Sequence, residues 1–300
     1  RMDEITECPD NTLSIKTTKG EIHAGALLLA PGHSARDTYH YLIKQNYAIE
    51  AKPMSVGVRV EHLQAEIDRA LYGAFAGHPN LGPAEYALSD TKGERGVYTF
   101  CMCPGGMIIP SSTEEGQLVV NGMSSSLRNS QFANSGIVVS ITEADATKFA
   151  SEGALSLMRF QQECERKMYI DKQIAPAQRI GDFMANRTSQ NLCRSSYPSG
   201  LHACNMNEFL PNIVSDTLQQ GFAVFDRKIA GFVSNDALMI GLEARTSSPV
   251  RIPRDKDSMQ HLQLKNLYPC GEGAGYAGGI TSSAIDGVNA AIKIAETLAQ

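Results

Sequence analysis

The sequence contains no tryptophan, only 7% aromatic residues and no long apolar stretch. No run approaches the roughly 18 apolar residues of a membrane-spanning helix, so we expect no membrane partner. Positive charge is also scarce, since 27 lysines and arginines against 32 acidic residues give a net charge of −5. Because no basic run offsets this balance, nucleic acid is not expected to be a main partner.

The cysteines do not suggest a disulfide framework. There are seven, an odd number, and they are scattered apart from Cys101 and Cys103. This usage fits a reducing, cytoplasmic setting. A chain of 300 residues is long enough for two domains. It begins at Arg1 rather than methionine and enters an expected strand at once, which predicts that the natural N-terminus is missing.

The most informative stretch is a loop with five glycines between Gly271 and Gly279. A short strand over 264–268 leads into it, and helical periodicity predicts a helix that begins near Thr281. A strand, a glycine loop and a helix N-terminus together bring bare N–H groups and a positive dipole end against an anionic or polar ligand. The alternative is a glycine-rich turn without a ligand.

Residues 273–278 also match the G-x-G-x-x-G dinucleotide fingerprint. That fingerprint needs a complete βαβ unit and an acidic residue roughly 20 positions on. Only 22 residues follow Gly278, and none of them can form the next strand. We therefore expect a ligand loop of another kind.

The rest of the chain predicts a discontinuous domain organisation. The apolar run 26–30 is typical of a strand buried on both faces of a parallel sheet, and a helix is expected over 37–45. From residue 52 the pattern changes to short alternating strands, a helix over 62–72 and a long helix over 144–167, with loops over 124–135 and 182–212. We expect residues 1–51 and 250–300 to form one dinucleotide-type domain, with residues 52–249 inserted as a second.

Two motifs resemble those of two-dinucleotide-binding flavoproteins: the strand and loop of residues 27–36, and the glycine motif of residues 268–280. More closely, residues 30–36, 98–106, 245–252 and the glycine motif resemble an uncharacterised group of bacterial FAD-dependent dehydrogenases. The resemblance implies a split, Rossmann-type FAD/NAD(P)-binding domain with an inserted mixed α+β substrate domain. One departure is that the family's N-terminal glycine fingerprint is absent, so the FAD-binding domain is expected to be incomplete.

The resemblance also implies a cofactor site. Glu272 would accept hydrogen bonds from the ribityl chain, or else be a solvated loop carboxylate, and the helix at Thr281 would point at the flavin ring. Arg36 would contact phosphate or ribose, with a surface arginine as the alternative, and His33 is more readily a structural group. The implied FAD-binding residues are Ala30, Gly32, Ser34, Arg36, Gly271, Glu272, Gly273, Ala274, Gly275, Gly278, Gly279, Ile280 and Thr281.

Arg245 and Arg251 flank a cluster of hydroxyl residues, a pattern suited to an anionic substrate or hydride donor. The alternative is a loop salt-bridged to Glu243 and Asp255. Tyr276 is the third catalytic candidate, either covering the flavin ring or serving as a packing residue.

Cys101 and Cys103 invite a redox or metal interpretation, but residues i and i+2 are poorly spaced for a disulfide, and no second Cys/His pair completes a metal site. We expect them to line a substrate pocket beside residues 121–123.

Together these features predict an FAD-dependent oxidoreductase that passes a hydride between a small, anionic substrate and flavin N5. NAD(P)H is a candidate electron donor, and the oligomeric state is not indicated. The alternatives are a flavin-binding RNA-modifying or macromolecule-binding protein, or a fragment without a ligand.

Overall fold

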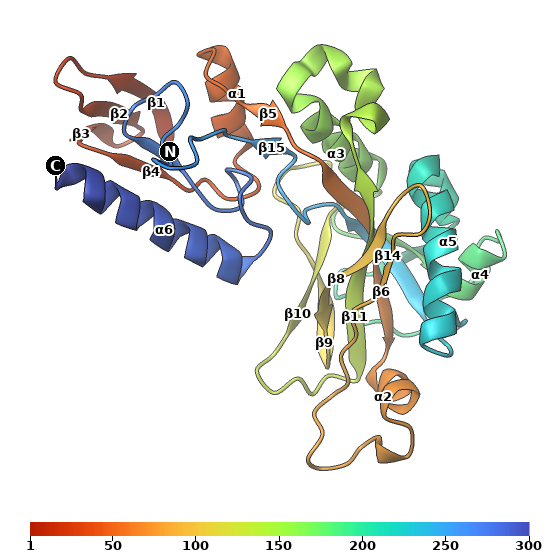
Figure 1. Cartoon of the computed structure of the whole chain (residues 1–300). Coiled ribbons are helices and arrows are strands. Elements are labelled where there is room, and N and C mark those ends of the chain that lie inside the picture. Colours follow the sequence, from red (N-terminus) through yellow and green to blue (C-terminus); the bar gives the residue numbers. More distant parts are fainter. Residues whose placement is uncertain (300) are drawn as a thin grey trace. The chain divides into compact units, whose positions relative to one another are not determined.

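The computed structural model describes residues 1–299 and divides the chain into two compact units. Unit 1 comprises Arg1–Met54, Thr142–Phe160 and the chain from Ser247 onward, and unit 2 comprises Ser55–Ile141 and Gln161–Thr246. Both units combine helices and strands (Figure 1). The fold is therefore mixed α/β.

Within residues 1–299, unit 1 contains three small sheets, two complete α-helices, the 3-10 segment η2 (Glu143–Leu155) and the first residues of α3 (Ser156–Lys167). An antiparallel sheet has the order β1 (Met2–Glu7), β2 (Leu13–Thr17), β3 (Gly20–Ala24); β5 (Glu50–Ala51) pairs with β15 (Val250–Arg251), and β4 (Leu27–Leu29) with β16 (Leu267–Pro269). The helices are α1 (Arg36–Lys44) and α6 (Ile280–Leu298). Both predicted helices are present, with ends shifted by one residue.

The strands β4 and β16 are parallel, with Leu28 opposite Tyr268. This agrees with the parallel pairing predicted from the apolar run, but burial on both faces was wrong, because Leu28 is 39% exposed. Tyr268 and Cys270 instead pack in a small cluster with Ala290 of α6. One face of the pair is therefore covered by the C-terminal helix.

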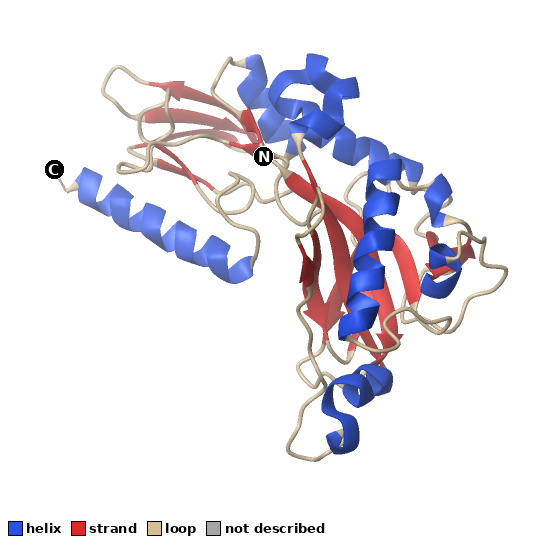
Figure 2. Cartoon of the chain, turned by 45° about the vertical axis from the view of Figure 1, so that its right-hand side comes forward, coloured by secondary structure: helices blue, strands red, loops and turns tan. Residues whose placement is uncertain are grey.

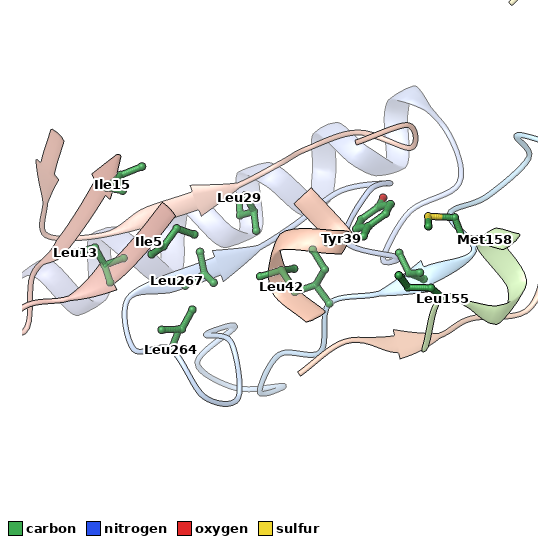
Figure 3. Close-up of a cluster of buried hydrophobic side chains, with 13 residues drawn as sticks. Ile5, Leu13, Ile15, Leu29, Tyr39, Leu42, Leu155, Met158, Leu264 and Leu267 are labelled. Atoms are coloured by element: carbon green, nitrogen blue, oxygen red, sulfur yellow. The ribbon is translucent and has the colours of Figure 1, made fainter. Parts of the chain in front are cut away.

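The main core of unit 1 joins residues from all three of its sequence segments (Figure 3). Its buried members are Ile5, Leu13, Ile15, Leu29, Tyr39, Leu42, Leu155, Met158, Val250, Ile252, Leu264, Leu267 and Ala274. Leu155 and Met158 come from residues 142–160, which the sequence analysis placed in the insertion. Their apolar side chains pack with the flanking segments instead, while the assignment of the two units as FAD-binding and substrate domains stays a prediction.

The expected continuous helix over 144–167 was wrong. A 3-10 segment, η2 (Glu143–Leu155), precedes α3 (Ser156–Lys167). The backbone of η2 leaves helical geometry at Ala146, Phe149 and Gly153, and Gly153 has a φ of +56°. Glycine adopts such a φ without steric penalty, so the chain bends there instead of continuing as one helix.

Unit 2 is organised around a seven-stranded mixed sheet of order β13-β12-β14-β6-β11-β8-β7 (Figure 2). The strands are β6 (Met54–Leu63), β7 (Ser89–Asp90), β8 (Val97–Cys103), β11 (Phe132–Ile141), β12 (Ala175–Arg179), β13 (Leu201–Ala203) and β14 (Leu238–Glu243). A separate hairpin pairs β9 (Gly106–Pro110) with β10 (Val120–Ser124). The helical segments are α2 (Gln64–Tyr72), η1 (Gly73–Phe75), α4 (Ile180–Met184), η3 (Met206–Glu208) and α5 (Asn212–Lys228).

Three local expectations in unit 2 need correction. The region after residue 52 forms one long strand, β6, rather than short alternating strands, because nearly all of its residues are buried in the sheet interior. The expected loop over 124–135 ends earlier, since β11 begins at Phe132, and the expected loop over 182–212 includes β13 and η3. Among the helices within residues 1–299, none is long and apolar enough to cross a membrane.

Candidate functional site

Two loops of unit 1 meet where the parallel strands β4 and β16 end. Gly273 lies directly against Gly32: a Cβ on Gly273 would be 2.1 Å from the Gly32 carbonyl oxygen and 2.7 Å from its nitrogen. No side chain fits between backbones at that separation. The predicted cofactor residues of the two loops are therefore brought together by the fold.

Tyr39 of α1 stabilises the contact between Gly32 and Gly273 from inside the core. Its hydroxyl donates to the Gly273 carbonyl at 2.9 Å and lies 3.3 Å from the carbonyl oxygens of Gly32 and His33. Burial raises the pKa of Tyr39 to about 12, so the hydroxyl keeps its proton at neutral pH. Nε2 of His33 is 3.0 Å from the Ser247 carbonyl, which gives this histidine a structural contact.

The glycine loop has a crowded side and an open side. At Gly275, where φ is +84°, a Cβ would lie 2.8 Å from the Val250 carbonyl oxygen. At Gly32 no heavy atom lies within 4 Å of the Cβ position, and at Gly279 the nearest is 3.9 Å away. Glycine is thus required on one side by packing against the protein, and on the other side it leaves free space beside the backbone.

An ion pair that the sequence analysis missed anchors the start of the loop. Arg254 and Asp286 form two hydrogen bonds, of 2.6 and 3.0 Å. Arg254 also donates to the Pro269 carbonyl at 2.7 Å, and Asp286 accepts the Gly271 N–H at 2.8 Å. The pair therefore ties the end of β16 to the first turns of α6. The two residues are 32 positions apart, so no local spacing could have indicated the pairing.

Tyr276 packs on the Arg254–Asp286 ion pair, called here the Asp286–Arg254 clamp. The Arg254 guanidinium lies 3.7 Å from the centre of its ring, and the tyrosine hydroxyl accepts the Arg254 N–H at 3.0 Å. Stacked guanidinium and ring planes are a favourable cation–π arrangement. These contacts are those of a packing residue, while the contact of Tyr276 with a flavin ring stays a prediction.

Three charged side chains gather at the same loop. Burial raises the pKa of Glu272, while nearby Lys52 opposes that rise. Burial and the charge of Arg251 lower the pKa of Lys52. The Arg251 guanidinium lies 5.6 Å from the Tyr276 ring, and its buried Nε has no hydrogen-bond partner among the described residues. Two partly desolvated cations beside one carboxylate form a site with spare capacity for an anion.

The other predicted arginines have separate positions. Arg245 belongs to unit 2, where its Nε is 3.1 Å from Glu165 Oε1, and it also donates to Thr113. The alternative partners, Glu243 and Asp255, were wrong, because Glu243 pairs with Arg59 and Asp255 binds its own loop through Ser258. Arg36 is buried at the start of α1, so it is not a surface arginine, and Ser34 is half-buried beside it.

The N-terminus of α6 is open. Ile280 is 93% exposed, Thr281 is exposed, and the first turn carries no acidic residue. The Gly279 N–H donates to Ser282 Oγ at 3.2 Å. The following N–H groups and the positive end of the helix dipole are therefore not neutralised by a side chain of this turn.

Cys101 and Cys103 are both free thiols. Cys101 has a φ of +43°, where a bulge shifts the β8–β11 register, and Cys103 donates to its carbonyl at 3.4 Å. Arg59 lies 3.1 Å from the same carbonyl oxygen and 3.8 Å from Cys103 Sγ. Across residues 1–299, no group of three or more histidine, cysteine or acidic side chains is arranged to hold a metal ion.

Three comparisons relate this chain to known proteins. The crystal structure of CtdE in complex with FAD aligns over 98% of this chain and 54% of that chain, at 10% identity and a TM-score of 0.34. A score at that level does not establish a shared fold. An uncharacterized protein of Clostridium beijerinckii (strain ATCC 51743 / NCIMB 8052) is 41% identical over 303 residues, which is 99% of this chain and 56% of that protein.

The chain thus spans about half the length of the curated relative it matches. The model of one family, described as "FAD-dependent protein, C-terminal domain-like", matches residues 53–246. That match covers most of the chain and includes nearly all of unit 2. The chain belongs to this FAD-dependent protein family.

Proposed function

We propose that this protein is an FAD-dependent oxidoreductase and that unit 1 holds the cofactor. The observation that carries the proposal is the junction of Gly273 with Gly32, which unites two separate glycine loops at the ends of parallel strands. Ligands of α/β folds commonly bind beyond the carboxyl ends of parallel strands. Membership of an FAD-dependent family supports FAD as the ligand.

The residues at the junction fit such a cofactor. Gly32 and Gly279 leave space beside their backbones, and the open turn of α6 offers N–H donors to a polar group. Glu272 is a half-buried carboxylate suited to hydroxyl groups. The proposed FAD-binding residues of the first loop are Ala30, Gly32, Ser34 and the buried cation Arg36. Those of the second are Gly271, Glu272, Gly273, Ala274, Gly275, Gly278, Gly279, Ile280 and Thr281.

Bound FAD would supply hydride chemistry at flavin N5. The chain's own contribution is electrostatic and positional. The N-terminus of α6 favours negative charge by about 0.3–2 kcal/mol when it faces a partly buried site. Tyr39, Arg254 and Asp286 hold the loops in place through the contacts described above.

We further propose that Lys52 and Arg251 hold an anionic group of the substrate or of a hydride donor such as NAD(P)H. Both are cations beside the glycine loop, and Lys52 Cδ would be 3.1 Å from a Cβ on Gly275. Arg245 is engaged with Glu165 in unit 2, so we do not extend this role to it. Unit 2 is then proposed as the substrate domain.

The test is an absorption spectrum of purified protein mixed with FAD and then freed of unbound cofactor. We would compare this chain with its full-length relative, since the chain spans 56% of that protein. Retention of the oxidised-flavin band by either protein supports the proposal. Absence of the band from both proteins would mean that the glycine loops serve another ligand.

A further inference from the structure

The helix α6 carries an apolar face that is largely exposed. Its large side chains, Ile285, Val288, Ile292 and Leu298, are 52–64% exposed, and the alanines at positions 291 and 295 between them are exposed as well. Successive helical residues turn by about 100°, so these six positions lie on one side of α6, within an arc of about 140°. In Figures 1 and 2, α6 lies along the strands of unit 1, and its opposite side faces no other described element of that unit. We call this face the exposed stripe.

The exposed stripe is separate from the two sides that a surface helix needs. The packed side of α6 includes Asp286, which accepts the Gly271 N–H, and the fully buried Ala290. The polar side carries Asn289 and Glu296, which are exposed. A surface helix normally has one apolar stripe toward the core and polar residues elsewhere. With a second apolar stripe, α6 has the pattern of a helix that is covered on two sides.

The sheet beneath α6 is also incompletely covered, on the side of β4. Leu28 of β4 and Tyr268 of β16 are paired in register, so their side chains lie on the same face of the sheet. Tyr268 packs with Ala290 of α6 and is 0% exposed, whereas Leu28 is 39% exposed. Within residues 1–299 this sheet has only the two strands, so the other edge of β4 is unpaired.

The exposed stripe adjoins β4. Leu298, at the end of the stripe, lies beside the residue two positions before β4, because a Cβ on Gly25 would be 3.4 Å from Leu298 Cδ2. Parallel strands occur almost only in sheets whose two faces are covered, and an unpaired strand edge is a liability. A strand beside β4 would pair that edge, and a helix over the new strand would lie alongside α6 and bury the stripe. The family has polypeptide to supply both, because this chain corresponds to only 56% of the Clostridium beijerinckii protein.

We propose that the exposed stripe and the unpaired edge of β4 form one docking surface. Its occupant is a strand-and-helix segment of the longer polypeptide, outside the residues matched to this chain. The strand pairs with β4, and the helix packs apolar side chains on Ile285, Val288 and Ile292. The proposal does not depend on the ligand of the glycine loops, and its tests measure contacts and stability rather than flavin content.

The first experiment is photo-crosslinking in the full-length Clostridium beijerinckii protein, with p-benzoylphenylalanine at the position aligned with Ile285. Mass spectrometry of the digested product identifies the peptide that is joined to the probe. We expect a crosslink within one molecule, to a segment outside the 303 matched residues. The control probe, at the position aligned with the exposed Asn289, should give no such crosslink. A crosslink between two molecules would assign the stripe to a second copy and overturn the proposal, as would a crosslink within the matched residues or none at all.

The second experiment compares one substitution in the two proteins. Ile292→Glu should change the melting temperature of this chain by no more than about 2 °C, because Ile292 is 52% exposed. Glutamate at the aligned position of the full-length relative should lower its melting temperature by about 5 °C or more, because the charge is then buried without a partner. Asn289→Glu, on the polar side of α6, is the control and should shift neither protein by more than about 2 °C. Equal shifts of the two proteins on the change at position 292 would overturn the proposal.

Discussion

The backbone of Gly273 touches the backbone of Gly32 so closely that a Cβ at Gly273 would lie 2.1 Å from the Gly32 carbonyl oxygen. The requirement for glycine at this position therefore comes first from the neighbouring loop. Any side chain at this position would force the two loops apart.

We predict that Gly273→Val lowers the free energy of unfolding by about 1–3 kcal/mol, the usual cost of overpacking, and reduces FAD retention with it. Thermal unfolding and flavin content measure the two effects. Gly287→Ala in α6 is the matched control, because its Cβ would meet nothing within 4 Å. That change should stabilise the helix by about 0.5–1 kcal/mol. Equal stability of the two variants would contradict the interlocked loops.

The Asp286–Arg254 clamp predicts an acid-dependent loss of stability. Burial alone would raise the pKa of Asp286, but hydrogen bonds from Arg254 and the Gly271 N–H lower it below its ordinary value. A carboxyl whose folded pKa is lowered stabilises the fold above its unfolded pKa of about 4. This contribution disappears as the pH falls through the folded pKa.

Asp286→Asn should therefore lower the free energy of unfolding at neutral pH by about 3–5 kcal/mol, because it leaves Arg254 without its counter-charge. It should also flatten the acid dependence below about pH 4. Urea unfolding at a series of pH values measures both, with Asp257→Asn as an exposed control in unit 1. An unchanged acid profile would show that the clamp contributes no pH-dependent stability.

Lys52 is expected to lower the stability of the folded protein, although it is proposed to bind an anionic ligand. Its pKa is lowered by burial and by the charge of Arg251, so the charged form is disfavoured in the folded state. Because the folded pKa of this base is lowered, its charge reduces the free energy of unfolding at every pH below that pKa. The wild type then gains stability as the pH rises through the folded pKa toward the ordinary value of 10.5.

We expect Lys52→Met to raise the melting temperature at neutral pH, to lose the gain at alkaline pH and to weaken retention of FAD or an anionic substrate. Differential scanning fluorimetry between neutral and alkaline pH gives the first two results, and flavin content gives the third. Lys256→Met, at an exposed lysine of unit 1, should change none of the three. Destabilisation by Lys52→Met would argue that the lysine is structural.

The buried pair Arg59–Glu243 should behave as a unit in the sheet of unit 2. The two side chains are 0% and 2% exposed and 2.7 Å apart, and Arg59 also donates to Asn134 at 2.7 Å. Glu243→Gln should lower the free energy of unfolding by about 3–5 kcal/mol, since it leaves a buried guanidinium without its counter-charge. Chemical denaturation measures this loss, with the exposed Glu115→Gln as control.

The double variant Arg59→Met with Glu243→Leu should cost less than the sum of the two single variants, because it removes both charges together. Additive losses would mean that the two charges do not interact across the sheet.

The local elements of the candidate site could be predicted from the sequence. The glycine loop, the helix that follows it and the strand over 26–30 are set by neighbouring residues, through glycine spacing and through periods of 3.6 and 2. The resemblance added FAD as the expected ligand and a split dinucleotide-type domain as its expected surroundings. The family match then supported the FAD-dependent class.

Only the tertiary structure decided which side chains meet. Arg254 pairs with Asp286, 32 residues away in the sequence, and Arg245 pairs with Glu165, 80 residues away. Residues 142–160 pack into the core of unit 1. Such pairings depend on how strands and helices stack, and no short window of sequence contains that information. The glycine loops could therefore be predicted from the sequence, but the residues that hold them in place could be identified only from the tertiary structure.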